Sequence, residues 1–117
     1  MSEMSQSALC ALSEWIDAGN AGRDPEAVTW GRLGKIAEEN GEVIEAFIGA
    51  TGQNPRKGVT CTVEKVLEEL LDVAITALGA YEHLDGHQGR ALWELDRKIV
   101  AVAERAGLVN EVGGFQK

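Results

Sequence analysis

Residues 70–81, with the sequence LLDVAITALGAY, decide the fold of this chain. Asp72 and Thr76 are the only polar side chains in this stretch, and their spacing of four residues places both on one stripe of a helix. A helix that is hydrophobic on almost every side is normally buried. We therefore expect a buried helix over residues 62–84, with Asp72 shielded from solvent.

A buried carboxylate must be protonated, paired with a cation or coordinated to a metal ion. No Lys or Arg occurs between Lys65 and Arg90, so no local salt bridge is available to Asp72. A metal ion and a salt bridge from another helix are the two remaining interpretations of this residue.

A second acidic cluster, EENGE at residues 38–42, lies in another helix-forming segment. Residues three apart are neighbours on a helix, so Glu39 with Glu42, and Glu69 with Asp72, each present two carboxylates side by side. Four such groups on packed helices would repel one another unless a multivalent cation neutralised them. Hard cations such as Mg²⁺ or Mn²⁺ prefer oxygen ligands, so the pattern predicts a metal site.

The rest of the chain predicts an all-α fold with four helices and no strand. The first covers about residues 5–18, and the second, with Asp24 as N-cap and Pro25 in its first turn, continues to about residue 50. Its glycines suggest the close approach of another group or a break near residues 30–34. The third begins after an N-cap at Thr60 or Thr62, and the fourth covers about residues 89–106 before Gly107. Residues 108–117 are predicted to be a tail.

Residues 25–84 should form an antiparallel hairpin, because a short polar loop at residues 51–58 joins two helices with apolar faces. The number of residues from Glu42 to the end of its helix is about the same as the number from the start of the next helix to Glu69. At about 1.5 Å of rise per residue, the two acidic clusters would lie at similar heights.

Composition limits the class of protein. The 117 residues suit a single domain, and the net charge of −8 argues against nucleic acid or an anionic membrane as partner. Cys10 and Cys61 are too few for a disulfide framework and are expected to be reduced. The sequence shows no signal peptide and no apolar span of membrane length, so a cytoplasmic protein is expected.

The pattern Glu38-Glu39-x-x-Glu42 followed by Glu69-x-x-Asp72 resembles the signature of the MazG-like all-α nucleoside triphosphate pyrophosphohydrolases, a superfamily that includes dimeric dUTPases. The resemblance covers about residues 30–84. It implies Mg²⁺-dependent cleavage of a nucleoside triphosphate between the α and β phosphates. It also implies that Glu39, Glu42, Glu69 and Asp72 bind the metal, with Glu38 in a further metal contact or orienting the attacking water.

Candidate substrate-binding residues are less specific. Lys98 and Arg105 resemble a Lys and Arg pair of short MazG-like proteins, although Val102 stands where an Asn is often found. Lys98 and Arg105 are equally typical of solvated cations on an amphipathic helix. In the loop, Arg56 or Lys57 could reach an anionic substrate or simply face solvent.

The aromatic and imidazole side chains also allow more than one interpretation. Trp30 could stack on a base or pack in the core, whereas Trp15 and Trp93 are expected in the core. His83 and His87 are four apart, but Asp85 and Gly86 between them indicate a helix end. We therefore do not predict a metal site there.

An apolar third helix needs more cover than three other helices supply, so a homodimer or homotetramer is expected. A non-catalytic module that binds metal or nucleotide is the alternative to an enzyme. A redox di-metal bundle is disfavoured, because such sites use Glu-x-x-His and neither histidine follows a Glu by three residues.

Overall fold

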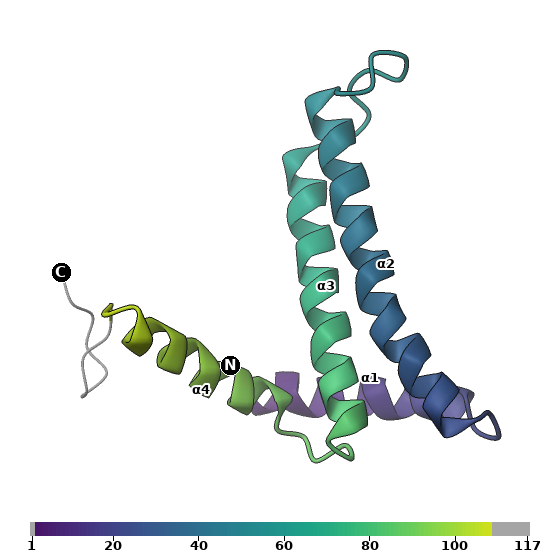
Figure 1. The fold of residues 1–117 in the computed structure, drawn as a ribbon, viewed down its shortest axis with the longest axis vertical. Helices are drawn as coiled ribbons and strands as arrows, with labels where there is room; N and C mark the ends of the chain where they lie inside the picture. The colour runs from purple at the N-terminus through teal and green to yellow at the C-terminus, as the bar shows by residue number, and fades with distance from the viewer. Residues whose placement is uncertain (1, 109–117) are drawn as a thin grey trace.

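A computed structural model describes residues 2–108, which form four α-helices and no strand, as predicted. Figure 1 shows α2 and α3 side by side as an upright antiparallel hairpin, α1 across its base and α4 projecting from the base. Residues 109–117, most of the predicted tail, lie outside the described part. The helices have these bounds: α1 Glu3–Gly19, α2 Pro25–Thr51, α3 Val63–Leu84 and α4 Ala91–Arg105.

The predicted helix ends are confirmed by their caps. The Asp24 carboxylate accepts a hydrogen bond from the Ala27 N–H at 3.0 Å, and the Thr62 hydroxyl accepts one from the Lys65 N–H at 3.2 Å. Gly107 follows α4 with a φ of 76°, the left-handed conformation that favours glycine. These contacts satisfy N–H groups that have no partner within their own helix.

The predicted break in α2 is wrong, because the helix runs without interruption from Pro25 to Thr51. A Cβ atom added at Gly31, Gly34 or Gly41 would meet nothing within 4 Å, so no backbone packs closely there. Close packing occurs instead at Gly49, where a Cβ would lie 2.7 Å from the Thr60 hydroxyl. Each glycine in α2 lowers helix stability by about 1 kcal/mol relative to alanine. Packing of this long helix along α3 outweighs that loss.

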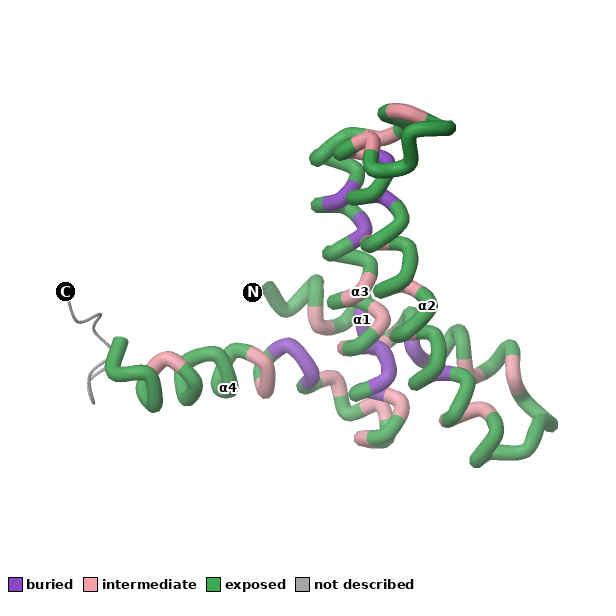
Figure 2. Tube along the Cα trace, turned by 45° about the horizontal axis from the view of Figure 1, so that its top comes forward, coloured by how far each residue is buried: buried purple, intermediate pink, exposed green. Residues whose placement is uncertain are grey.

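The hydrophobic core is small and lies at the base, where α1, α3 and α4 meet. Leu9, Ala91 and Leu92 are buried there, and Leu78 packs against them. Figure 2 shows buried segments at this junction and in part of the hairpin, while most of α4 is exposed. The predictions that Trp15 and Trp93 lie in the core are wrong for the single chain, because both are exposed.

Several large apolar side chains of α3 are also exposed in this chain, contrary to the expectation of a buried helix. They include Leu67, Leu70, Leu71 and Ile75, and Asp72 is exposed with them. The radius of gyration is 17.8 Å, against about 13 Å for a compact chain of this length. The accessible surface is 8418 Å², against about 6,200 Å² for a compact monomer of 12.5 kDa.

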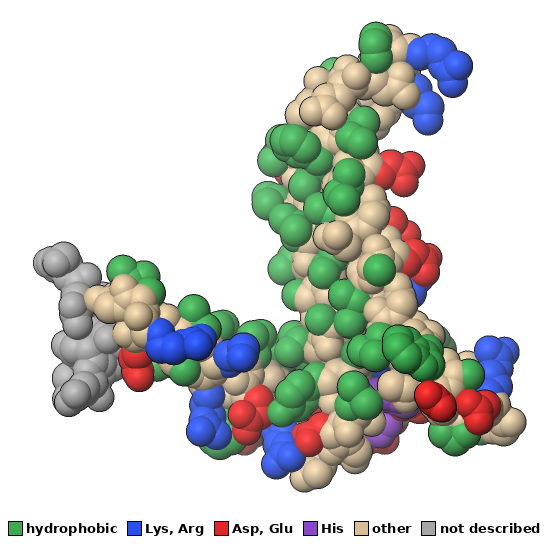
Figure 3. Space-filling model, in the orientation of Figure 1, with side chains coloured by type: hydrophobic (Ala, Val, Ile, Leu, Met, Phe, Trp, Pro, Cys, Tyr) green, Lys and Arg blue, Asp and Glu red, His purple; other side chains and the backbone are tan. Residues whose placement is uncertain are grey.

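Figure 3 shows where this apolar surface lies: hydrophobic side chains run along the hairpin, and acidic side chains gather at its opposite edge in this view. Across residues 2–108, no helix combines the length and the apolar character that crossing a membrane requires.

Candidate functional site

The hairpin brings three of the four predicted metal ligands together. Glu39 of α2 and Glu69 and Asp72 of α3 each place a carboxylate oxygen within 4.8 Å of the others. The antiparallel pairing of α2 with α3 produces this cluster, because it sets the first acidic segment against the second at the same height. We call Glu39, Glu69 and Asp72 the acidic cluster.

Glu69 is the buried member of the acidic cluster, with 8% of its surface exposed. Its Oε1 atom lies 3.2 Å from Lys65 Nζ, but its Oε2 atom is buried and has no hydrogen-bond partner among the described residues. Burying a charged oxygen without a hydrogen-bond partner costs more free energy than a normal hydrogen bond contributes to stability. This oxygen fits a metal ligand, and Glu69 with Asp72 and Glu39 forms the all-oxygen set that Mg²⁺ or Mn²⁺ prefers.

The fourth predicted ligand, Glu42, borders the acidic cluster on the exposed side of α2. The nearby Glu39 carboxylate, followed by desolvation and the charge of Glu69, raises the pKa of Glu42 above its usual value. Negative charge is therefore concentrated here, as a cation site requires. Glu38 lies outside the cluster with its carboxylate 3.1 Å from Lys35 Nζ, so its predicted catalytic role stays a prediction.

Both acidic segments carry one pattern that the sequence analysis missed, Lys-x-x-Glu-Glu-x-x-Glu/Asp, as KIAEENGE at residues 35–42 and KVLEELLD at residues 65–72. In each, the lysine lies near two glutamates: Lys35 Nζ is 3.1 and 3.6 Å from the carboxylates of Glu38 and Glu39. Lys65 Nζ is 3.9 and 3.2 Å from those of Glu68 and Glu69.

Burial follows the same repeat. The inner glutamate side chains, Glu39 and Glu69, are 14% and 11% exposed, whereas the outer ones, Glu38 and Glu68, are 61% and 72% exposed. Hydrogen bonding to Glu38 raises the pKa of Lys35, and hydrogen bonding to Glu69 raises that of Lys65. Two lysines therefore act as internal counter-ions of the acidic cluster.

A cavity of about 580 Å³ lies between α1, α2 and α3, a size typical of small-molecule sites. Apolar side chains such as Leu12, Ile16 and Ile75 form most of its wall. Arg32 and Lys35 supply positive charge, and Lys35 Nζ is also 3.6 Å from the Glu39 carboxylate. The cavity thus opens one helical turn from the acidic cluster.

The other predicted substrate-binding residues are not brought to this cavity by their own chain. Trp30 is 68% exposed and does not line it, and Lys57 is exposed in the loop after α2. Lys98 lines a separate cavity between α3 and α4, and Arg105 ends α4. Because α4 projects away from the hairpin (Figure 1), these two cations could approach an acidic cluster only in an assembly.

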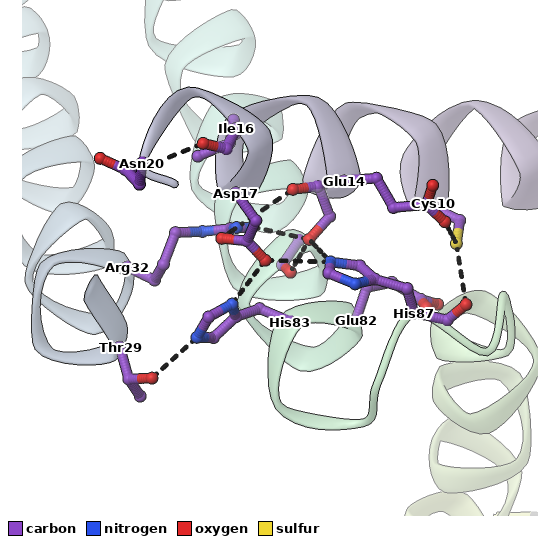
Figure 4. Close-up of polar contacts among 12 residues, drawn as sticks. Cys10, Glu14, Ile16, Asp17, Asn20, Thr29, Arg32, Glu82, His83 and His87 are labelled. Atoms are coloured by element: carbon purple, nitrogen blue, oxygen red, sulfur yellow. Dashed lines mark hydrogen bonds and ion pairs between the residues drawn. The ribbon is translucent and has the colours of Figure 1, made fainter. Parts of the chain in front are cut away.

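A second polar cluster, which the sequence analysis missed, lies at the base of the hairpin and contains Asp17, Arg32, His83 and His87. Asp17 Oδ1 accepts a hydrogen bond from Arg32 Nη1 at 2.8 Å. Asp17 Oδ2 lies 2.6 Å from His83 Nδ1 and 3.1 Å from His87 Nε2. Figure 4 shows Asp17 between the two imidazole rings and the Arg32 side chain. We call these four residues the base cluster.

Burial alone would raise the pKa of Asp17, but hydrogen bonds from His83 and Arg32 outweigh it and hold the pKa below its usual value. Arg32 is 8% exposed and also donates to the Ser13 hydroxyl at 2.9 Å. The signal in the sequence was Ser13 with Asp17, two polar residues four apart on α1. It could not identify the partners, which come from α2, from the last turn of α3 and from the loop after α3.

The two cysteines are free thiols, as predicted. Burial, followed by a hydrogen bond to Glu14, raises the pKa of Cys10 to about 11. Its thiol therefore stays protonated and unreactive at neutral pH.

Comparisons with protein-family models, with curated proteins and with solved structures each found no match for this chain.

Proposed function

We propose that this chain is a Mg²⁺-dependent nucleoside triphosphate pyrophosphohydrolase that releases a nucleoside monophosphate and pyrophosphate. The observation that carries the proposal is the buried Glu69 Oε2 atom, which has no partner in the described chain and faces a cluster of carboxylates. Glu39, Glu69 and Asp72 would hold the ion, with Glu42 completing the ligand set. The signature Glu-Glu-x-x-Glu and Glu-x-x-Asp supports the same assignment.

The bound ion would neutralise charge on the phosphate oxygens and lower the pKa of an attacking water. The protein supplies the remaining functions. Lys35 borders both the acidic cluster and the cavity, so it is placed to contact a phosphate chain that extends between them. The apolar wall of the cavity would hold the nucleoside, and Glu38 would orient the water.

We further propose that the chain acts as a homodimer or homotetramer. Its surface exceeds that of a compact monomer by about 2,200 Å², an area of the size that obligate subunit interfaces bury. The excess includes the exposed apolar side chains of α3, and a second copy covering them would also bury Asp72 further. Size-exclusion chromatography with light scattering at micromolar concentration should show at least a dimer. A monomer would contradict this part of the proposal.

Catalysis is tested with a panel of NTPs and dNTPs plus Mg²⁺, by detecting monophosphate and pyrophosphate separately. Turnover to these two products supports the proposal, and release of diphosphate and inorganic phosphate would contradict the bond assignment. If no nucleotide turns over at several pH values, a non-catalytic module that binds metal or nucleotide becomes the better description.

A further inference from the structure

We propose that Asp17, His83 and His87 bind a divalent transition-metal ion of the Zn²⁺ class, at a site separate from the acidic cluster. Each offers one ligand atom within 4.8 Å of the others. Two imidazoles and a carboxylate are a donor set suited to Zn²⁺, Ni²⁺ or Co²⁺ rather than to Mg²⁺. Three protein ligands leave one coordination position for water.

The ligand atoms are oriented by further hydrogen bonds, as in metal sites generally. His83 presents Nδ1 to Asp17 while its Nε2 lies 2.7 Å from the Thr29 hydroxyl. Asp17 presents Oδ2 to both rings while Arg32 holds Oδ1. Metal bonds can therefore replace the contacts of Asp17 with the two imidazoles. The contacts of His83 with Thr29 and of Asp17 with Arg32 are kept.

The backbone at His87 is a second, independent observation. Its φ is 57°, the only positive φ of a non-glycine residue in the described chain. Residues held in this way cluster at functional sites. The His87 N–H donates to the Glu82 carbonyl at 2.8 Å, and its own carbonyl accepts from Cys10 Sγ at 3.3 Å. The fold thus fixes an imidazole at a position where glycine or asparagine would be less strained.

The charges at and near the base cluster also favour the binding of a cation. Asp17 and the buried Glu82 carry two negative charges, and Arg32 supplies one positive charge. Glu82 is engaged by the backbone N–H groups of Gly89 and Ala91 rather than by a side-chain cation. With neutral imidazoles the group is short of one positive charge. An ion bound at His83 Nδ1 would leave the imidazole proton on Nε2, where the Thr29 hydroxyl, which donates to the Pro25 carbonyl, can accept it.

The experiment is a Co²⁺ titration of the full chain at pH 7.5 with excess Mg²⁺ present to saturate the acidic cluster. We expect one equivalent of Co²⁺ to bind per chain, with visible d–d absorption and displacement by Zn²⁺. The Glu69→Gln variant should bind Co²⁺ equally well. The His87→Asn variant, which keeps a residue that tolerates the left-handed conformation, should bind at least tenfold more weakly.

Two results would overturn the proposal: no Co²⁺ bound when Mg²⁺ is in excess, or binding lost in Glu69→Gln but kept in His87→Asn. Because a variant at the base could fail to fold, the unaltered protein provides a second measurement. Bound Co²⁺ should give paramagnetic shifts to the imidazole resonances of both His83 and His87. Unshifted resonances would place the ion elsewhere and would leave the base cluster as a hydrogen-bonded network only.

Discussion

The acidic cluster and the base cluster are both made by packing α2 and α3 with their neighbours, but they differ in how completely their polar atoms are paired. In the acidic cluster, Glu69 Oε2 has no partner and Glu42 is held at a raised pKa by negative neighbours. In the base cluster, both Asp17 oxygens, the Arg32 guanidinium and both histidines have partners. In the metal-free chain, the acidic cluster therefore keeps a buried oxygen without a partner, whereas the base cluster already holds α1 to the hairpin through paired atoms before any ion binds.

This comparison predicts that variants of the acidic cluster lose activity without unfolding. We expect Glu69→Gln to lower turnover by at least about 100-fold, because it removes a metal ligand. Loss of a residue that only hydrogen-bonds to a metal ligand has a smaller effect. The melting temperature without metal should not fall, because a repelling charge is removed. The matched control is Glu68→Gln, one residue away and exposed. Equal loss in both variants would contradict the ligand assignment.

The reverse result is expected at the base, where Asp17→Asn should destabilise the metal-free protein by about 3 kcal/mol. The substitution leaves the buried Arg32 cation without its partner. Urea unfolding with a chelator present measures the effect, and Asp96→Asn, on the exposed part of α4, serves as control. A change below about 0.5 kcal/mol would mean that the base cluster does not hold the fold.

The same residue gives a pH dependence. The pKa of Asp17 in the folded chain lies below its usual value of 3.8. Its contribution is therefore fully present above the usual value and is lost as the pH falls through the lower, folded pKa. Acid unfolding of the unaltered protein should show this loss, and the Asp17→Asn variant should lack it.

Glu82 tests whether the base also fixes α4. The Glu82 carboxylate, 1% exposed, accepts hydrogen bonds from the Gly89 and Ala91 N–H groups at 2.9 and 2.8 Å. Arg90, at the N-cap position of α4, does not cap the helix with its own side chain. We expect Glu82→Gln to cost about 1–2 kcal/mol, like the loss of a helix cap. Glu104→Gln near the other end of α4 is the control. An unchanged unfolding midpoint would contradict the capping role.

The smallest expected effect concerns the internal counter-ions of the acidic cluster. Lys65→Met should tighten Mg²⁺ binding about two- to fivefold, because Mg²⁺ would no longer compete for Glu69 with the half-exposed Lys65 ammonium, in an ion pair worth up to about 1 kcal/mol. Isothermal titration calorimetry without nucleotide measures this, with Lys57→Met as control. Weaker Mg²⁺ binding would show that Lys65 supports the site rather than competing for it.

Whether the sequence predicts a region depends on how far apart in the chain the contacting residues of that region lie. The helices, their caps at Asp24 and Thr62 and the acidic cluster depend on spacing within a segment and on one short loop, and all were predictable. The base cluster joins residues far apart in the chain, such as Asp17 and His83, which are 66 positions apart, and no local pattern specifies those pairs. The expected burial of Asp72 and Trp93 failed for a different reason, because the hydrophobicity of a face favours its burial but does not show whether this chain supplies the residues that would cover it.

The repeated segments at residues 35–42 and 65–72 have a consequence for protein engineering. Because they run in opposite directions with matching carboxylates and lysines, either one is a template for the other. A hairpin with two copies of KVLEELLD would keep glutamate as the inner acid on both helices while replacing the glycine of α2 with a strong helix former. Such a two-fold symmetric motif could be transplanted into a designed helical bundle as a compact cation site.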